Sequence, residues 1–269
     1  MFAYQFMRNA FIVAIFVSVA ATCIGHVVVL RRQANLGDAL SHSALAGVAL
    51  GVVMNINPTL GSLLGTLLAA LVLELLRRLF PRYQEISTAI VMALAVGLAA
   101  IFSSFAGSGQ SFQSYLFGSI VAISDLERNL SIGISLVVIL VTLLFYKEIF
   151  FINFDKNQAR LSGVPISLVE GLFTLLIALT VGISSRSVGT LVISSLLVLP
   201  YASAMLWQKS YRGTLLLAIG LSILNSGLGI TASYYLNLPP GGSIVVLSVL
   251  LLLLSAVISH IKHRPKAKA

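Results

Sequence analysis

The chain has 269 residues, of which 58% are hydrophobic and only 9% are charged, and its formal net charge is +9. This composition lies far outside that of soluble domains and predicts an all-α, polytopic membrane protein with a single transmembrane domain over residues 1–269. The basic residues gather at the ends of apolar runs and in the tail 262–269, as in cytoplasmic loops, so the charge does not indicate nucleic-acid binding. The single cysteine, Cys23, excludes an internal disulfide and any CxxC metal or redox motif.

Charges, prolines and glycines divide the chain into about nine apolar segments that could span a membrane. The first segment is too long for the apolar core of a cleavable signal and is itself a span. The second is the weakest prediction, because it is short and starts with glycine. If it or the first does not cross fully, the count becomes eight and the N-terminus moves inside. The predicted spans are residues 9–30, 37–54, 58–80, 85–106, 127–147, 165–182, 187–207, 213–236 and 242–261.

The distribution of lysine and arginine orients these spans. With nine spans and a cytoplasmic C-terminus, fourteen of the 17 basic residues lie inside, and only Arg8, Arg128 and Arg186 lie outside. Cytoplasmic loops carry an excess of Lys and Arg, so we expect the C-terminal tail in the cytoplasm.

The second span carries the strongest candidate site, in the stretch Gly37 to Gly47. Asp38 and His42 are four residues apart, so a helix places a carboxylate and an imidazole on one face. An ionisable group inside a bilayer is costly and marks a functional site by default, here one for a divalent cation or a proton. Asp38 also suits a helix N-cap, and the two interpretations are compatible. His26 has no acidic partner at helical spacing and is interpreted as a packed bundle histidine.

Two connections are longer than a hairpin needs. The external one, residues 107–126, is half apolar and could re-enter the protein. The internal one, residues 151–165, predicts a short amphipathic helix from about Asp155 to Leu161, capped by Gly163 and stopped by Pro165. Its apolar side chains are a docking surface for a partner or, alternatively, lie on lipid headgroups. They are Phe154, Ala159 and Leu161.

The motifs of nucleotide hydrolysis and nucleophilic catalysis are absent. The sequence has no Gly-x-x-x-x-Gly-Lys-Ser/Thr phosphate-binding loop and no Gly-x-Ser-x-Gly element. We therefore expect no enzymatic activity in this chain, and any ATP hydrolysis must belong to a separate subunit.

Several ordered blocks resemble the membrane permease subunits of ABC-type zinc, manganese and iron importers. The Gly-Asp-Ala-x-Ser-His block at Gly37 to Gly47 is followed by small residues, as in that family. A leucine run ends in a proline and small residues at Leu196 to Ala204, and the last span opens with Pro239 to Ile244. The loop pattern of the family matches Phe154, Asp155, Ala159, Gly163 and Pro165.

The resemblance implies a homodimeric permease of the prokaryotic cell membrane, with the pathway between its two copies. It also implies a pair of cytoplasmic ATPase subunits that contact the matching loop residues, and an extracytoplasmic protein that delivers the metal. Asp38 and His42 would then bind the metal in transit, which is cargo, and no cofactor is expected to be bound permanently.

The identity of the metal stays open between zinc, manganese and ferrous iron. Many manganese-type members have a proline where this chain has Ala46, which favours zinc slightly, although oxygen and nitrogen ligands suit all three ions. A proton-coupled secondary transporter using the same two residues is the alternative from another class.

Overall fold

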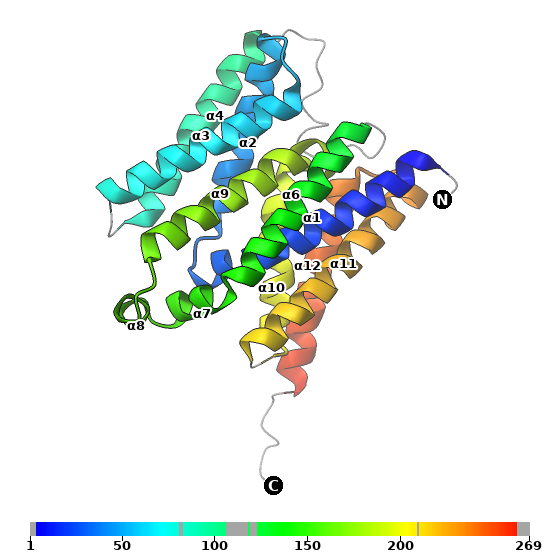
Figure 1. Cartoon of the computed structure of the whole chain (residues 1–269). Helices are drawn as coiled ribbons and strands as arrows, with labels where there is room; N and C mark the ends of the chain where they lie inside the picture. The colour runs from blue at the N-terminus through cyan, green and yellow to red at the C-terminus, as the bar shows by residue number, and fades with distance from the viewer. Residues whose placement is uncertain (1–3, 81–82, 106–117, 119–122, 209, 263–269) are drawn as a thin grey trace.

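The computed structural model describes residues 4–80, 83–105, 118, 123–208 and 210–262, and it is built of helices (Figure 1). Eight helices within these ranges are long and apolar enough to cross a membrane, which confirms the all-α membrane fold. They are α1 (Gln5–Leu30), α2 (Asn35–Val53), α3 (Pro58–Leu79), α4 (Gln84–Phe105), α6 (Asp125–Leu144), α9 (Ile166–Ser184), α11 (Tyr211–Leu236) and α12 (Pro240–Lys262). Shorter elements complete the described chain: α7 (Tyr146–Phe154), α8 (Lys156–Leu161), the π-helical turn η1 (Ser185–Gly189) and α10 (Thr190–Met205).

The predicted seventh span does not form one helix long enough to cross the membrane. The second span, which was the weakest prediction, is the 19-residue helix α2 and is long enough. Residues 187–207 are divided between η1 and α10, and α10 has 16 residues. At about 1.5 Å per residue such a helix rises about 24 Å, less than the roughly 30 Å of a hydrocarbon core. The hydroxyl of Ser259 near the end of α12 donates to the Leu206 carbonyl over 3.2 Å, so α10 and α12 end on the same side.

Local capping fixes several helix starts. The Asn57 side chain accepts a hydrogen bond from the Thr59 backbone N–H over 2.9 Å, and Pro58 occupies the first turn of α3. Helix α6 begins with a capping box in which Ser124 and Glu127 satisfy each other's backbone N–H groups. These caps fix the first residues of α3 and α6, and so the points at which these two helices enter the bundle.

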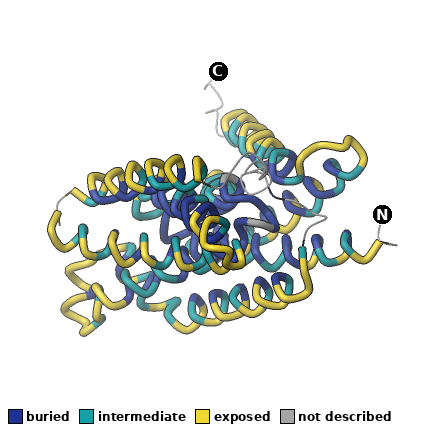
Figure 2. Tube along the Cα trace, turned by 90° about the horizontal axis from the view of Figure 1, so that it is seen from above, coloured by how far each residue is buried: buried dark blue, intermediate teal, exposed yellow. Residues whose placement is uncertain are grey.

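The bundle has a buried centre and apolar outer helices. Helices α1, α9 and α10 supply much of the core, while α3, α4 and α12 carry many exposed apolar residues. Figure 2 shows the buried tube at the centre of the bundle and the exposed residues on the outer helices. Helices α2, α3 and α4 pack together at one side of the bundle, and α11 and α12 pack together at another (Figure 1). Exposed leucines follow the outer face of α3, as expected of a surface that contacts lipid: Leu60, Leu64, Leu68, Leu71 and Leu75.

The ion pairs fall at the two ends of the bundle. At one end Arg31 contacts Asn153 and Glu170, and Lys156 contacts the same Glu170. At the other end Arg128 contacts Asn9 and Asp125. Residues that were predicted to share a side of the membrane therefore lie together, while the side that faces the cytoplasm stays a prediction. Most of the external connection 107–126 and the tail beyond Lys262 lie outside the described residues.

Candidate functional site

Asp38 and His42 lie on one face of α2, as their spacing predicts. Asp38 is in the first turn of the helix, and both residues are partly buried. Ala34, not Asp38, is the residue before the helix, and no side chain caps this N-terminus. The carboxylate is therefore not used as an N-cap, so the capping interpretation of Asp38 does not hold.

The packing of α2 places these two residues between two crowded faces. On one face the Ser41 hydroxyl donates to the Thr190 carbonyl of α10 over 2.7 Å, and a Cβ at Gly37 would lie 3.2 Å from the Ser194 side chain. The other face, which includes Ser43 and Ala46, points to α3 and α4. With 3.6 residues per turn, positions 38 and 42 fall between these faces.

Within the described part of the chain neither Asp38 nor His42 forms a hydrogen bond or ion pair. No group of three or more His, Cys, Asp and Glu side chains that could hold a metal occurs among these residues either. One copy of the chain thus offers an oxygen and a nitrogen ligand that are free to bind, and the remaining ligands must come from water or from another molecule. Two free ligands suit an ion that binds briefly and leaves.

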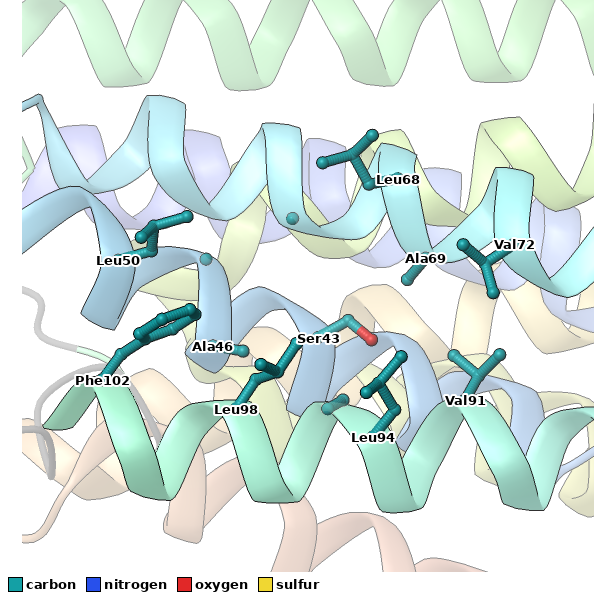
Figure 3. Close-up of a pocket in the computed structure, with 13 residues that line it drawn as sticks. Ser43, Ala46, Leu50, Leu68, Ala69, Val72, Val91, Leu94, Leu98 and Phe102 are labelled. Carbon is teal, nitrogen blue, oxygen red and sulfur yellow. The ribbon is translucent and has the colours of Figure 1, made fainter. Parts of the chain in front are cut away.

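An apolar cavity of about 230 Å³ lies beside this helix, between α2, α3 and α4 (Figure 3). Leu94 and Phe102 of α4 point toward it, and Leu50, Leu68 and Ala46 belong to its lining. Among the described residues of the lining, Ser43 alone carries a side-chain oxygen, and its hydroxyl already donates to the Ala39 carbonyl over 2.8 Å. A cavity of this chemistry offers an ion no ligands, so it does not extend the Asp38 and His42 site.

The predicted internal helix is present as α8, and its caps are formed as expected. The Asp155 carboxylate accepts hydrogen bonds from the backbone N–H groups of Asn157 and Gln158 over 2.8 and 3.2 Å. At the other end Gly163 has a positive φ of 78°, with hydrogen bonds from Gly163 to Arg160 and from Val164 to Ala159. This is a Schellman motif, in which glycine avoids the strain of the left-handed conformation.

The apolar residues of this segment face in different directions. Phe154 and Leu161 are 71% and 88% exposed, whereas Ala159 is fully buried against the core. The α7–α8 hairpin (Tyr146–Leu161) is therefore held to the bundle by Ala159 and presents Phe154 and Leu161 outward. Of the predicted docking residues, Ala159 is the one that does not lie on the surface.

Charged residues fasten the same hairpin to the bundle. Both the Nζ atom of Lys156 on α8 and an Nη atom of Arg31 after α1 contact the Oε1 atom of Glu170 on α9, at 2.9 and 3.2 Å. Burial lowers the pKa of Arg31 below its usual value, and the Glu170 carboxylate opposes that shift. Sequence reasoning missed this cluster, because its three members are far apart in the chain and form no local motif.

His26 is a buried bundle histidine, in line with its interpretation from the sequence. It has no exposed surface, its Nδ1 atom hydrogen-bonds the Cys23 carbonyl, and its ring contacts those of Tyr201 and Tyr211 at centroid distances of 6.0 and 5.6 Å. Cys23 is a buried free thiol on the same helix. The His26 ring therefore lies among aromatic rings, and among the described residues no group of three or more His, Cys, Asp and Glu side chains that could hold a metal includes it.

The turn η1 is a further feature that the sequence did not reveal. It precedes Thr190, whose carbonyl accepts the hydrogen bond from Ser41, and it ends at Gly189 with a φ of 99°. Gly118 packs on this turn so closely that a Cβ there would lie 2.6 Å from the Val188 carbonyl group. Short π-helical turns inside helices are frequent at functional sites. The one signal available beforehand was the Ser-Arg-Ser-Val-Gly run between two apolar segments.

Comparisons with known proteins agree along nearly the whole chain. The profile of the ABC 3 transport family matches residues 3–259. The sequence is 34% identical over 261 residues to a probable metal transport system membrane protein of Treponema pallidum, covering 97% of this chain and 98% of that protein. It is 33% identical over 265 residues to the manganese import system permease protein ScaB of Streptococcus gordonii, covering 98% and 95%.

A solved structure has the same fold. A chain of PsaBC from Streptococcus pneumoniae, determined in complex with Fab, superposes with a TM-score of 0.82 at 28% sequence identity. The alignment covers 94% of this chain and 91% of that one. The likeness in fold therefore extends over almost the whole helix arrangement described above.

Proposed function

The chain belongs to the ABC 3 transport family and is therefore the permease of an ABC-type divalent metal importer, and we propose that its cargo is manganese, held in transit by Asp38 and His42. The observation that carries the site is a carboxylate and an imidazole on one face of α2, partly buried and without partners in the described residues. As an ABC permease the chain is not itself an ATPase, and energy comes from ATP through another subunit. The proton-coupled alternative therefore loses its support.

Manganese replaces zinc as the preferred cargo because relatives of almost full length are named as manganese import permeases. The expectation of zinc depended on Ala46, and this residue lines the apolar cavity, whose lining offers an ion no ligands. Manganese prefers oxygen-rich, octahedral coordination, and the one cysteine of the chain is remote in sequence from Asp38 and buried. Zinc and ferrous iron are the competitors to test.

The two ligands of one chain fill only part of an octahedral shell. We infer that water and a second copy of the permease supply the rest, with the pathway between the two copies. The supporting observation is the partial exposure of Asp38 and His42, on a helix whose other faces pack against α3, α4 and α10. A site at a boundary between copies can open to either side when the copies move.

The α7–α8 hairpin is the proposed contact with the ATPase subunits. Phe154 at the end of α7 and Leu161 at the end of α8 are exposed apolar residues, and Asp155, Gly163 and Pro165 fix the ends of α8. An extracytoplasmic metal-binding protein would deliver the ion at the opposite end. This arrangement makes the C-terminal end of α12 cytoplasmic.

The test is uptake by the complete complex, with its ATPase and binding protein, in liposomes. We expect ATP-dependent uptake of radioactive manganese, inhibited less by excess zinc or ferrous iron than by excess unlabelled manganese. Asp38→Ala and His42→Ala should each lower the uptake at least about tenfold, because each removes one of two protein ligands and metal-site changes typically cost that much.

Two matched variants serve as controls. Asp125→Ala and His260→Ala remove the same side chains at exposed positions at the two ends of the bundle, and they should transport like wild type. Uptake that survives both α2 substitutions would contradict the site. Faster ATP-dependent uptake of zinc than of manganese would contradict the cargo while leaving the site intact.

A further inference from the structure

Glu170 joins three separate segments through one carboxylate. Its Oε1 atom lies 2.9 Å from Lys156 Nζ on α8 and 3.2 Å from an Arg31 Nη atom in the α1–α2 connection. The side chain of Arg31 is only 11% exposed and that of Glu170 21%, whereas that of Lys156 is half exposed. The inner pair is thus largely desolvated, and α8 is attached to it from the surface.

Few other contacts hold α8 in place. The helix has six residues, and Ala159 is its buried member. Its more extensive contacts with other helices are those with α7 and α9. A force applied to the exposed Leu161 would therefore be passed to the bundle through Ala159 and the Lys156–Glu170 ion pair, whereas α7 is anchored by its own buried Ile149 and Ile152.

The inner end of this cluster is connected to the helix that carries the metal ligands. Arg31 also donates from Nε to Asn153 Oδ1 over 3.2 Å, which ties α7 to the same point. Two residues later Gln33 hydrogen-bonds Gln84 on α4 and accepts a hydrogen bond from Arg77 on α3 over 3.2 Å. Helix α2 begins at Asn35, with Asp38 in its first turn.

The connection between α1 and α2 is also stiff. Arg32 has a positive φ of 57°, which a non-glycine residue adopts only where its surroundings hold it. The hydrogen bonds from Gln33 to Val28 and from Leu36 to Gln33 close a tight turn here. A displacement of Arg31 is thus carried to the base of α2 by a short, hydrogen-bonded segment.

We propose that Glu170 is a positioning residue of the transport cycle, which links α8 through Lys156 and Arg31 to the base of α2, so that movement of α8 shifts Asp38 and His42. This inference rests on the proposed function, because it needs an ATPase that moves α8. It adds a route between the proposed ATPase contact and the proposed metal site. Lys156 is the outer member of the route and Arg31 the inner one.

The decisive variant is Lys156→Gln, because Lys156 is half exposed and its loss leaves the inner Arg31–Glu170 pair in place. The measurement is the number of manganese ions transported per ATP hydrolysed by the complete complex in liposomes. We expect this ratio to fall about fivefold or more, the lower end of typical coupling between two sites. ATP hydrolysis, the amount of copurified ATPase and metal binding at Asp38 and His42 should stay at wild-type levels.

Two further variants separate coupling from folding and docking. Lys156→Arg keeps a cation within reach of Glu170 and should restore the ratio. Arg160→Gln removes the other cation of α8, which forms no ion pair within the described residues, and should leave the ratio unchanged.

An unchanged ratio in Lys156→Gln would overturn the inference, as would an equal fall in Arg160→Gln. Loss of the copurified ATPase in Lys156→Gln would also overturn it, because Lys156 would then be a docking contact. Failure of the wild-type complex to transport any divalent metal would instead refute the proposed function, so the two failures are distinguishable.

Discussion

Glycine contacts set how closely α2 approaches α3. A Cβ added to Gly47 would lie 2.2 Å from the Gly61 carbonyl oxygen, and one added to Gly61 would lie 2.4 Å from that of Gly47. Both obstacles are backbone atoms, which cannot rotate away. Small residues at such crossings let membrane helices pack by backbone contact, where the hydrophobic effect contributes little.

Replacing Gly47 by valine should therefore separate the two helices. Overfilling a packed contact typically costs about 1–3 kcal/mol, and we expect a clear fall in the melting temperature of the purified permease. Gly97→Val is the matched control, because no atom lies within 4 Å of a Cβ at this position on α4. Equal melting temperatures for the two variants would show that the crossing tolerates the extra volume.

The proposed functional residues differ in how readily the sequence predicts them. Asp38 and His42 could be predicted because helical spacing alone brings them to one face. Glu170, Arg31 and Lys156 could not, since a contact between residues this far apart depends on how the helices pack. The cost of a buried charge indicated that such residues need partners, but not which ones.

At the scale of elements, α8 shows what capping signals can and cannot predict. Asp155, Gly163 and Pro165 gave its boundaries correctly, because caps act within a few residues. Its orientation could not be read, since six residues are less than two turns and give no reliable periodicity. Ala159 consequently faces the core, although it had been grouped with the outward Phe154 and Leu161.

The division of the seventh span escaped prediction for a different reason. Hydropathy averages over a window, so it does not register a π-helical turn of five residues inside an apolar run. The break occurs where Gly189 has a positive φ and where Gly118, from a remote segment, contacts Val188. Tertiary packing therefore helps to place it, whereas the other spans are predicted by their length and composition.

Because Ala159 packs α8 against the core, Ala159→Trp should detach this helix from the bundle. The side chain cannot fit a position without exposed surface, and an overpacking cost of about 1–3 kcal/mol would raise the open population about fivefold or more. The measurement is the rate of trypsin cleavage after Lys156 and Arg160 in the purified permease without ATPase. We expect faster cleavage than in wild type.

Leu161→Trp is the control for this experiment. Leu161 belongs to the same helix but is 88% exposed, so an indole there meets no neighbour and cleavage should match wild type. Cleavage of Ala159→Trp at the wild-type rate would contradict the role of Ala159 in seating α8. The comparison needs no transport activity, which keeps it independent of the proposed function.

At the scale of the whole molecule, the polar contacts give the chain two chemically distinct ends. Arg31, Lys156 and Glu170 meet at one end, and Asn9, Asp125 and Arg128 meet at the other. The eight long helices run between these ends, and the shorter α10 ends on the same side as α12, because Leu206 accepts a hydrogen bond from Ser259. With η1 and α10 counted together as one crossing, we expect nine crossings that place Tyr4 and the C-terminal end of α12 on opposite sides of the membrane, although eight helices reach spanning length within the described residues.

This arrangement predicts which positions a membrane-impermeant maleimide can reach. Cys23 is buried, so Cys23→Ala gives a background without a native thiol at little cost. In that background Tyr4→Cys and Asp125→Cys should be labelled on intact spheroplasts, whereas Gln158→Cys on α8 should be labelled only after lysis. The physical reason is the excess of basic side chains at the end that carries α8, which anionic lipids and the positive-inside rule hold in the cytoplasm.

The Cys23→Ala protein without an added thiol is the control for background labelling. Labelling of Gln158→Cys before lysis would show that the orientation is the reverse of the one predicted. Labelling of Asp125→Cys together with protection of Tyr4→Cys would show that the chain crosses the membrane eight times, with its N-terminus inside.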